Sequence, residues 1–380
     1  MDRGRELTPP HPDSEYPADP YPGVAPGFSF VHLDAASHPV QADAAARGGW
    51  TVATAGPAGS GGEGIDSWLA AHGGEAMAAR VPVLTFGSNH CPTKITWLRD
   101  HLGLTGPVVV LRAEVRGVVA VWAAGLRARD GARPATLALS DRGHTETHAV
   151  WMATPAQVAV LDVCEGRGER YHLVRLHAAR IRTDDAAALD DPWTYWPVDG
   201  RRAPLLVDGV PVRCAEVGQQ DARDLVGTPA PLPARAVTPV AGAPEPDTWP
   251  RRVFVYGTLR PGRSAWWRLA PHAVTTEPAG CAGQVHETGR GYPALVPGPG
   301  RAVGTVVTLA DPAAALPGLD AYEGPEYRRA RGVAYLDSTS ASPEAPTRSS
   351  EGGDGRGTPC WMWVWDSPVP DGPAGGNPWR

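Results

Sequence analysis

The chain carries one sequence pattern twice, and this repetition limits the folds that are open to it. The pattern is an apolar strand that leads into a glycine turn, with Leu-Asp-x-x-Glu-Gly further along. The first copy lies at residues 83–89 and 161–166, and the second lies at residues 253–259 and 319–324. Self-similarity of this kind is typical of duplicated structural units. The sequence therefore predicts a tandem of two related domains.

A third pair of segments falls between the two parts of each copy, in the same order. Pro-Ala-Thr-Leu begins at Pro134 in the first copy, and Pro-Ala-Leu-Val begins at Pro293 in the second. A tyrosine also follows each Glu-Gly closely, as Tyr171 and as Tyr327. Collinear anchors rarely arise by chance, so they strengthen the prediction of a duplication.

Composition and charge narrow the classes of function. A chain of 380 residues has room for two or three domains of roughly 100–200 residues each. The net charge of −6 and the lack of a basic block argue against nucleic acid or a membrane surface as a partner, and they favour a small molecule. Lys94 is the only lysine among many arginines, which we interpret as a compositional bias without functional meaning.

The cysteines and the N-terminus bear on the cellular compartment. The five cysteines are scattered and form no C-x-x-C pair, so neither a disulfide framework nor a zinc site is predicted. The N-terminus lacks an apolar signal segment, and no run of about 18 apolar residues occurs. We therefore expect a soluble protein of the reducing cytoplasm.

Local composition suggests the domain boundaries. Residues 1–27 and 221–250 are rich in proline and lack apolar periodicity. The first of these segments is expected to be disordered and free of catalytic residues, and the second is expected to be a semi-stiff linker. The resulting division is a first domain at 28–220 with its core at 81–220, a second domain at 251–366 with a disordered insertion at 338–358, and a tail at 367–380.

Hydrophobic patterns predict individual elements. They indicate strands at 83–86, 107–112, 117–123, 332–337 and 360–365, helices at 65–70 and from Pro155 to about Glu165, and a hairpin that turns at Asp208-Gly209. Trp361, Trp363 and Trp365 alternate at strand period and so share one face. We interpret that face as covering a core rather than as a platform for sugars or bases.

The second copy resembles the γ-glutamylcyclotransferase superfamily, including its AIG2-like branch. The resemblance rests on Tyr256-Gly257-Thr258-Leu259-Arg260, on the segments at 291–297 and 303–306, and on Leu319-Asp320-x-x-Glu323-Gly324-x-x-Tyr327-Arg328. These motifs span the whole second domain. The first copy is more divergent, because Phe86 replaces the turn tyrosine, Asn89 replaces the leucine, and His148 lies near the position of Gly304.

The resemblance implies tandem α+β domains, each a small mixed β-barrel-like sheet, closed or nearly closed, with packed helices. It implies an enzyme in which the α-amine of a γ-glutamyl group attacks its own γ-carbonyl and releases 5-oxoproline and a free amine. Such a reaction requires no metal and no cofactor, because one glutamate can carry the proton and backbone N–H groups can stabilise the oxyanion. The implied partner is a small-molecule γ-glutamyl substrate, and the oligomeric state is left open.

The same resemblance assigns roles to individual residues. Glu323 is implied as the catalytic acid/base, with Glu165 as its counterpart, because a partly buried carboxylate beside a glycine turn can have a pKa near neutrality. The glycine of the turn is expected to allow close backbone approach and a positive φ. Substrate binding is expected from Tyr256, Gly257, Thr258, Leu259, Tyr292 and Tyr327 in the second domain, and from Phe86, Gly87, Ser88 and Asn89 in the first.

Two functions of other classes stay open. One is a non-catalytic module that binds a γ-glutamyl-like or carboxylate ligand without turnover. The other is a scaffold whose proline-rich segments, residues 1–27 and 221–250, engage partners.

Three weaker patterns are interpreted structurally. Residues 59–64 fit G-x-G-x-x-G but lack a βαβ context, which is more typical of a flexible glycine tract. His144, Glu146 and His148 alternate along a predicted strand, where an exposed polar face explains them as well as a metal site does. Cys164 is interpreted as a packing residue rather than as a nucleophile. We expect no metal site.

Overall fold

The computed structural model describes residues 10–53, 62–140, 143–337 and 357–367. The chain divides into two compact units. Unit 1 comprises Met1–Gln41, Thr51–Asp184 and Leu189–Pro246, and unit 2 comprises Ala42–Trp50, Asp185–Ala188 and Asp247–Arg380. None of the helices in the described ranges is both long and apolar enough to span a bilayer.

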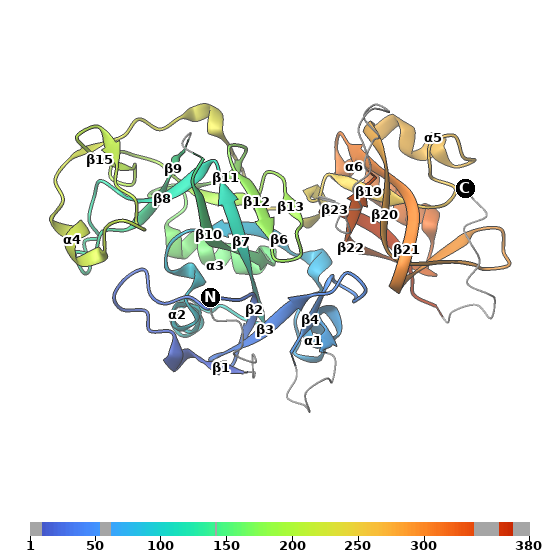
Figure 1. Cartoon of the computed structure of the whole chain (residues 1–380), viewed down its shortest axis with the longest axis horizontal. Helices are drawn as coiled ribbons and strands as arrows, with labels where there is room; N and C mark the ends of the chain where they lie inside the picture. Colours follow the sequence, from blue (N-terminus) through green and yellow to red (C-terminus); the bar gives the residue numbers. More distant parts are fainter. Residues whose placement is uncertain (1–9, 54–61, 141–142, 338–356, 368–380) are drawn as a thin grey trace, which may run out of the picture. The chain divides into compact units, whose positions relative to one another are not determined.

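The central strand of unit 1 is β6 (Val81–Thr85), which contains the buried apolar run of the first sequence copy (Figure 1). Its neighbours are β10 (Thr145–Ala153), which is antiparallel, and β14 (Trp193–Pro197), which is parallel. Beyond them lie β7 (Val108–Arg116) and β11 (Tyr171–Leu176). The central strand order is therefore β7-β10-β6-β14-β11.

Additional strands cover both outer edges of this five-stranded core. The free edge of β11 pairs with β18 (Val237–Pro239). The free edge of β7 pairs with β2 (Phe30–Leu33) near its start and with β12 (Arg180–Thr183) near its end. Strand pairing at an edge satisfies backbone groups that would otherwise be open to other chains.

Unit 2 contains a closed barrel whose pairings follow the same order. Strand β19 (Arg252–Val255) lies between antiparallel β21 (Pro293–Leu309) and parallel β23 (Gly357–Trp365). The outer neighbours are β20 (Ala273–Glu287) and β22 (Tyr327–Leu336). Here β20 and β22 also pair with each other, and this seam closes the barrel.

The barrel is filled by alternate residues of its strands. Cys360, Met362 and Val364 point into the interior cluster, as the period of two requires. The three tryptophans between them, Trp361, Trp363 and Trp365, are also buried, on the opposite face of the strand. The interpretation of this indole face as one that covers a core is confirmed.

One helix in each unit ends at the glutamate of the repeated motif. Helix α3 (Pro155–Glu165) begins with a capping box between Thr154 and Gln157, and helix α6 (Pro312–Glu323) begins with a cap from the Asp311 side chain. Gly166 and Gly324 follow these helices with φ of 65° and 77°. The Glu-Gly pair therefore marks the last helical residue and the residue that leaves the helix at positive φ.

Several other predicted elements are confirmed. Strand β8 (Val118–Trp122) pairs with β9 (Ala135–Leu139), and helix α1 (Ile65–Ala71) matches the apolar pattern at 65–70. Asp208 and Gly209 both have positive φ and connect β15 (Leu205–Val207) to β16 (Val210–Pro211). The predicted insertion lies almost wholly outside the described residues.

The remaining elements complete the chain. The other helices are α2 (Pro92–Leu102), α4 (Gln219–Asp224) and α5 (Trp266–Leu269), and the other strands are β1 (His11–Pro12), β3 (Ala36–Ala42), β4 (Trp50–Val52), β5 (Glu63–Gly64), β13 (Ala188–Leu189) and β17 (Thr228–Pro229). Short 3-10 turns occur at Asp13–Glu15, Met77–Ala79, Ser88–His90, Ala234–Ala236, Pro246–Thr248 and Ala270–His272.

The prediction of disorder for residues 1–27 is wrong for residues 10–27. Tyr16 is buried, and its carbonyl accepts a hydrogen bond of 2.6 Å from the Thr93 hydroxyl. The Tyr21 hydroxyl accepts a hydrogen bond of 2.9 Å from the Ala135 backbone N–H. Two aromatic side chains thus fasten a segment whose overall composition resembles that of a disordered tail.

The prediction that residues 221–250 form a linker is also wrong for most of that range. Strand β18 joins the sheet of unit 1, and helix α4 includes the start of the range. The Arg133 guanidinium donates hydrogen bonds of 2.8 Å to the carbonyls of Leu225 and Ala123. Because Arg133 is buried, this arginine anchors the segment to unit 1.

Candidate functional site

Each unit contains a pocket at the end of its central strand. The pocket of unit 1 encloses about 430 Å³ and that of unit 2 about 240 Å³. The turn after the central strand and the glutamate at the end of the long helix contribute to both walls. Every residue that the sequence put forward lines one of the two pockets: Phe86, Gly87, Ser88, Asn89 and Glu165 in unit 1, and Tyr256, Gly257, Thr258, Leu259, Tyr292, Glu323 and Tyr327 in unit 2.

The aspartate of the repeated motif fixes the helix that carries the glutamate. In unit 2 the Trp363 indole N–H donates to Asp320 Oδ1 at 2.9 Å. In unit 1 the Tyr195 hydroxyl donates to Asp162 Oδ1 at 2.8 Å. Each aspartate thus connects its helix to the strand that runs parallel to the central one. This contact explains why Leu-Asp precedes Glu-Gly in both copies.

Glu323 has the electrostatic properties of a proton carrier near neutral pH. Burial raises the pKa of its carboxyl to about 7, and the negative charge of Asp320 adds to this effect. In the described part of the chain, no group donates a hydrogen bond to the Glu323 carboxylate. The carboxyl is therefore available to a ligand in the pocket.

Glu165 is held more firmly in unit 1. The Asn89 side chain donates from Nδ2 to Glu165 Oε1 at 2.7 Å. Burial raises the pKa of Glu165, while the hydrogen bond from Asn89 and the charge of Lys94 act in the opposite direction. The leucine at the equivalent place in unit 2, Leu259, cannot make such a bond. The two glutamates therefore have different hydrogen-bonding surroundings in otherwise similar positions.

The glycine of each turn is required by close packing. A Cβ atom on Gly257 would lie 2.8 Å from Cγ of Pro293, and one on Gly87 would lie 2.8 Å from the Tyr21 hydroxyl. The expected positive φ at these glycines is wrong: φ of Gly87 is −122°, and Gly257 is not in the left-handed region either. The glycines permit close approach and do not relieve backbone strain.

Backbone N–H groups of the turn at residues 257–259 in unit 2 are available to a ligand. The carbonyls of Gly257 and Thr258 accept hydrogen bonds from the N–H groups of Arg260 and Ala265. The N–H groups of Gly257, Thr258 and Leu259 have no acceptor within the described ranges. Adjacent N–H groups without acceptors form a site suited to a carboxylate or an oxyanion.

The tyrosines of unit 2 are largely engaged with the protein. Tyr256 donates to the Trp363 carbonyl at 2.9 Å and accepts from the Leu295 N–H at 3.3 Å, so its hydroxyl joins two strands. Tyr327 donates to the Pro293 carbonyl at 2.7 Å. These two residues form the wall of the pocket rather than free hydrogen-bonding groups.

The mouth of this pocket is polar. Tyr292 donates to Glu326 Oε2 at 2.7 Å, and Arg290 forms an ion pair with the same carboxylate. The Thr258 hydroxyl lies 3.0 Å from the Tyr322 hydroxyl. Glu326 and Tyr322 were not predicted from the sequence, although both lie beside Glu323.

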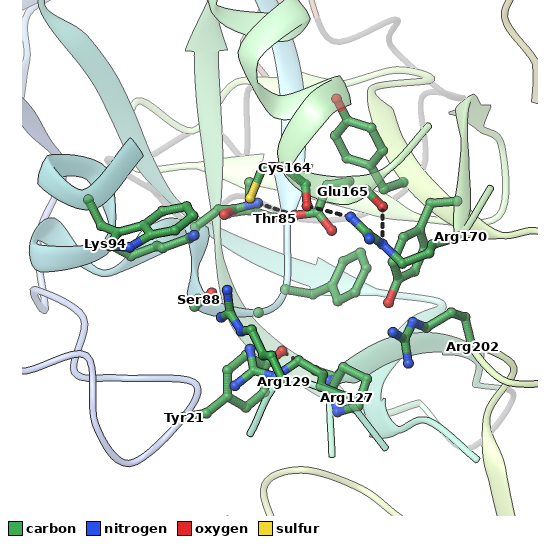
Figure 2. Close-up of a pocket in the computed structure, with 18 of the residues that line it drawn as sticks. Tyr21, Thr85, Ser88, Lys94, Arg127, Arg129, Cys164, Glu165, Arg170 and Arg202 are labelled. Atoms are coloured by element: carbon green, nitrogen blue, oxygen red, sulfur yellow. Dashed lines mark hydrogen bonds between the residues drawn. The ribbon is translucent and has the colours of Figure 1, made fainter. Parts of the chain in front are cut away.

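Residues outside the repeated motifs contribute to the pocket of unit 1, as Figure 2 shows. Tyr21 comes from the segment expected to be disordered. Four basic side chains border the pocket away from the motif: Lys94, Arg127, Arg129 and Arg202. The interpretation of Lys94 as a mere consequence of composition missed its place in this wall. The feature of the sequence that could have pointed to this residue is that Lys94 is its only lysine.

The weaker sequence patterns do not form sites in the described residues. Glu146 accepts from Arg213 at 2.8 Å and lies 3.0 Å from His148 Nε2, which makes it part of a salt-bridge network. Within the described ranges no group of three potential ligands is placed to hold a metal ion. Residues 59–61 of the glycine tract lie outside the described residues. Burial and the charge of Glu165 raise the pKa of Cys164, so this thiol is not activated.

One comparison with known proteins bears on the fold of unit 2. Residues 253–380 match the family described as Gamma-glutamyl cyclotransferase, AIG2-like. The five-stranded barrel lies in this range, and its fold fits the family. A search of the curated proteins found no match. Among solved structures, the crystal structure of YkqA from Bacillus subtilis matches 75% of this chain and 84% of its own chain at 13% identity, with a TM-score of 0.21.

Proposed function

We propose that unit 2 releases 5-oxoproline and a free amine from a γ-glutamyl amine or amide. The observation that carries this proposal is the Glu323 carboxyl, with its pKa of about 7, in a pocket that also holds the turn with its available N–H groups. A proton carrier is most effective when its pKa lies near the working pH. The match of residues 253–380 to the cyclotransferase family supports the same reaction type.

The proposed reaction needs only groups that line this pocket. Ionised Glu323 takes a proton from the substrate α-ammonium, and the resulting amine nitrogen attacks the γ-carbonyl carbon of the same molecule. The oxyanion that forms is stabilised by the N–H groups of Gly257, Thr258 and Leu259. Glu323 then returns the proton to the leaving nitrogen as the original amide C–N bond breaks. The ring nitrogen gives up its second extra proton, which Glu323 passes to the released amine, so that 5-oxoproline with a neutral lactam nitrogen and an ammonium ion leave. Holding amine and carbonyl in attack geometry supplies a large share of the acceleration.

We further propose that unit 1 is a divergent second copy of this domain. Its strand order β7-β10-β6-β14-β11 parallels β20-β21-β19-β23-β22, with the same senses of pairing. Trp193 pairs in parallel with Val83, and Trp361 pairs in parallel with Val253. The contact between aspartate and aromatic residue recurs as well. Two units that share pairing order, helix ends and pocket residues are most simply related by duplication.

The alternative for unit 1 is a binding module without turnover. The hydrogen bond from Asn89 to Glu165 favours it, because this bond stabilises the ionised carboxylate and restricts its movement. In unit 2 no such bond is present among the described residues. Catalysis is therefore proposed first for unit 2.

The test is to measure 5-oxoproline release from a panel of γ-glutamyl amines and peptides by mass spectrometry. The wild type is compared with Glu323→Gln, Glu165→Gln and the double variant. Loss of release with Glu323→Gln alone assigns the reaction to unit 2. Glu277→Gln is the matched control, because Glu277 is an exposed acid of β20 outside the pocket. Binding of a panel member by wild type without any release would replace this proposal with the binding module.

A further inference from the structure

The pocket of unit 1 has a positive charge that the pocket of unit 2 lacks. Five basic side chains line it: Lys94, Arg127, Arg129, Arg170 and Arg202. Glu165 is the only acid among the described residues of this lining. The described lining of the other pocket contains two acids, Glu323 and Glu326, and no lysine or arginine. Arg290 pairs with Glu326 at the mouth of that pocket. The lining of unit 1 therefore has an excess of positive charge, and the lining of unit 2 does not.

Three of these basic side chains, Arg170, Arg127 and Arg129, already interact with other groups of the protein. Arg170 donates to the carbonyls of Glu165 at 3.0 Å and Cys164 at 2.9 Å, so it caps the end of α3. Asp130 accepts from Arg127 at 2.9 Å and from Arg129 at 3.2 Å. One carboxylate thus orients two guanidinium groups and neutralises only one of their charges.

Lys94 and Arg202 border the pocket on opposite sides of the view in Figure 2. The Lys94 ammonium lies 3.5 Å from the centroid of the Trp97 ring, which fixes its position. The Arg202 guanidinium has no hydrogen-bond acceptor among the described residues, although its charge acts on Glu165. With the Arg127 and Arg129 pair, these groups surround the cavity with positive charge (Figure 2).

Beside Glu165, the pocket also has a buried acceptor. Asn89 is nine-tenths buried, and its Nδ2 is directed to Glu165. Its Oδ1 has no hydrogen-bond partner among the described residues. An unsatisfied buried oxygen is costly unless a ligand donates to it. Next to the Glu165 carboxylate, this oxygen suits an ammonium group.

We propose that the pocket of unit 1 binds a γ-glutamyl compound whose far part carries two or more negative charges. The α-ammonium contacts Asn89 Oδ1 and Glu165, and the anionic part lies against Lys94, Arg127, Arg129 and Arg202. This inference rests on the γ-glutamyl chemistry proposed above for the head of the ligand.

The second pocket provides the internal reference for this assignment. A γ-glutamyl head carries its own α-carboxylate in either pocket, and in the function proposed for unit 2 that carboxylate is bound without a lysine or arginine in the described lining. The cations of unit 1 are therefore in excess of what the head requires. The larger cavity, about 430 Å³ against about 240 Å³, leaves room for the additional part. Carboxylate and phosphate both fit such a cluster, since arginine binds either with paired hydrogen bonds.

The test is calorimetric titration of the full chain carrying Glu323→Gln, which suppresses turnover in unit 2. The probes are γ-glutamylglutamate, γ-glutamylphosphoserine and γ-glutamylglycinamide, the last having an uncharged far end. Each is titrated into this protein, and into versions that also carry Arg202→Gln or Arg201→Gln. Arg201 is an exposed neighbour outside the lining, so it controls for loss of a positive charge.

We expect the two anionic probes to bind at least about tenfold more tightly than the glycinamide, and Arg202→Gln to remove about tenfold of that affinity. Arg201→Gln should change none of the three, and Arg202→Lys should restore part of the loss. Whichever anionic probe binds more tightly identifies carboxylate or phosphate as the source of the charge. Equal affinity for the glycinamide, or equal effects of Arg201→Gln and Arg202→Gln, would overturn the inference.

Release of 5-oxoproline separates this inference from the proposed function when it is measured for the wild type and for the Glu323→Gln protein, because release by that variant comes from unit 1. Tight binding of an anionic probe that depends on Arg202, without release, supports the inference and removes catalysis from unit 1. Equal release from the anionic probes and the glycinamide by unit 1 supports catalysis and overturns the charge preference.

Discussion

The indole N–H of Trp363 donates to Asp320 Oδ1 at 2.9 Å, and through this contact the last barrel strand holds the helix that ends at Glu323. The same carboxylate forms an ion pair of 3.1 Å with Arg329. Asp320 therefore positions Glu323 and also raises its pKa by charge repulsion. These two effects can be separated, because asparagine keeps the acceptor oxygen and removes the charge.

Asp320→Asn should move the pH dependence of the proposed reaction toward acid. The acid limb of the wild-type kcat/KM profile is expected to rise with a midpoint near pH 7, as Glu323 ionises. Without the neighbouring charge the midpoint should fall, yet stay above that of an ordinary carboxyl, because burial is the larger cause of the shift. Rate profiles from pH 5 to 9 measure it. A midpoint unchanged from wild type, as expected for the control Asp337→Asn, would contradict this assignment.

Glu323→Gln should change the stability of unit 2 in a pH-dependent way. The carboxyl has a pKa of about 7 in the folded state against the ordinary value of 4.5, so protonated Glu323 stabilises the fold below pH 4.5. This contribution is lost as pH rises through 7. Above pH 7 the wild type therefore carries a penalty of up to about 3 kcal/mol that glutamine avoids. Denaturant unfolding of both proteins at pH 5 and pH 8 measures the difference, which should be larger at pH 8.

Gly257→Ala should destabilise unit 2 and weaken ligand binding. The added Cβ would lie 2.8 Å from Cγ of Pro293, which forces the turn and the hairpin start apart. Overpacking of this kind costs about 1–3 kcal/mol. Gly318→Ala is the matched control, because a Cβ at that helical position meets nothing within 4 Å and should be neutral or stabilising. Thermal unfolding should occur at a lower temperature than in the wild type for Gly257→Ala, and at the same or a higher temperature for Gly318→Ala.

Tyr21→Phe should destabilise unit 1. The Tyr21 hydroxyl accepts the Ala135 N–H at 2.9 Å, and its removal leaves that donor without a partner beside the pocket. Such a loss costs about 1–3 kcal/mol. Urea unfolding of unit 1 reports it, and Tyr335→Phe in unit 2 serves as the control. If both variants unfold unit 1 at the wild-type concentration of urea, the N-terminal segment does not contribute to its stability.

The pocket walls formed by the repeated motifs were accessible to prediction because their constraints are local. A glycine that must follow a strand, and a glutamate that ends a helix before a glycine, appear in the sequence as short fixed patterns. Gly257 and Glu323 therefore stand out without knowledge of the fold. The reason for Asp320 becomes clear only in the structure, since its partner Trp363 lies far along the chain.

The structural features that the sequence did not predict depend on contacts between segments that are far apart in the chain. Tyr21 reaches Ala135, and β18 reaches β11, although the composition of both segments resembles that of unstructured chain. The cations of unit 1 escaped notice for another reason. In a chain where nearly every basic residue is arginine, single arginines carry no signal, and only the fold brings Arg127, Arg129 and Arg202 together.

The pairing of β20 with β22 closes the barrel of unit 2, whereas the equivalent outer strands of unit 1, β7 and β11, pair with other strands. Where unit 2 closes on itself, unit 1 relies on β18 to occupy the outer edge of β11. A recombinant fragment that ended at residue 220 would leave that edge bare, and a bare strand invites pairing with another copy of the same fragment. Because β18 covers this edge, any dissection of the protein into halves should keep the proline-rich segment with the first half.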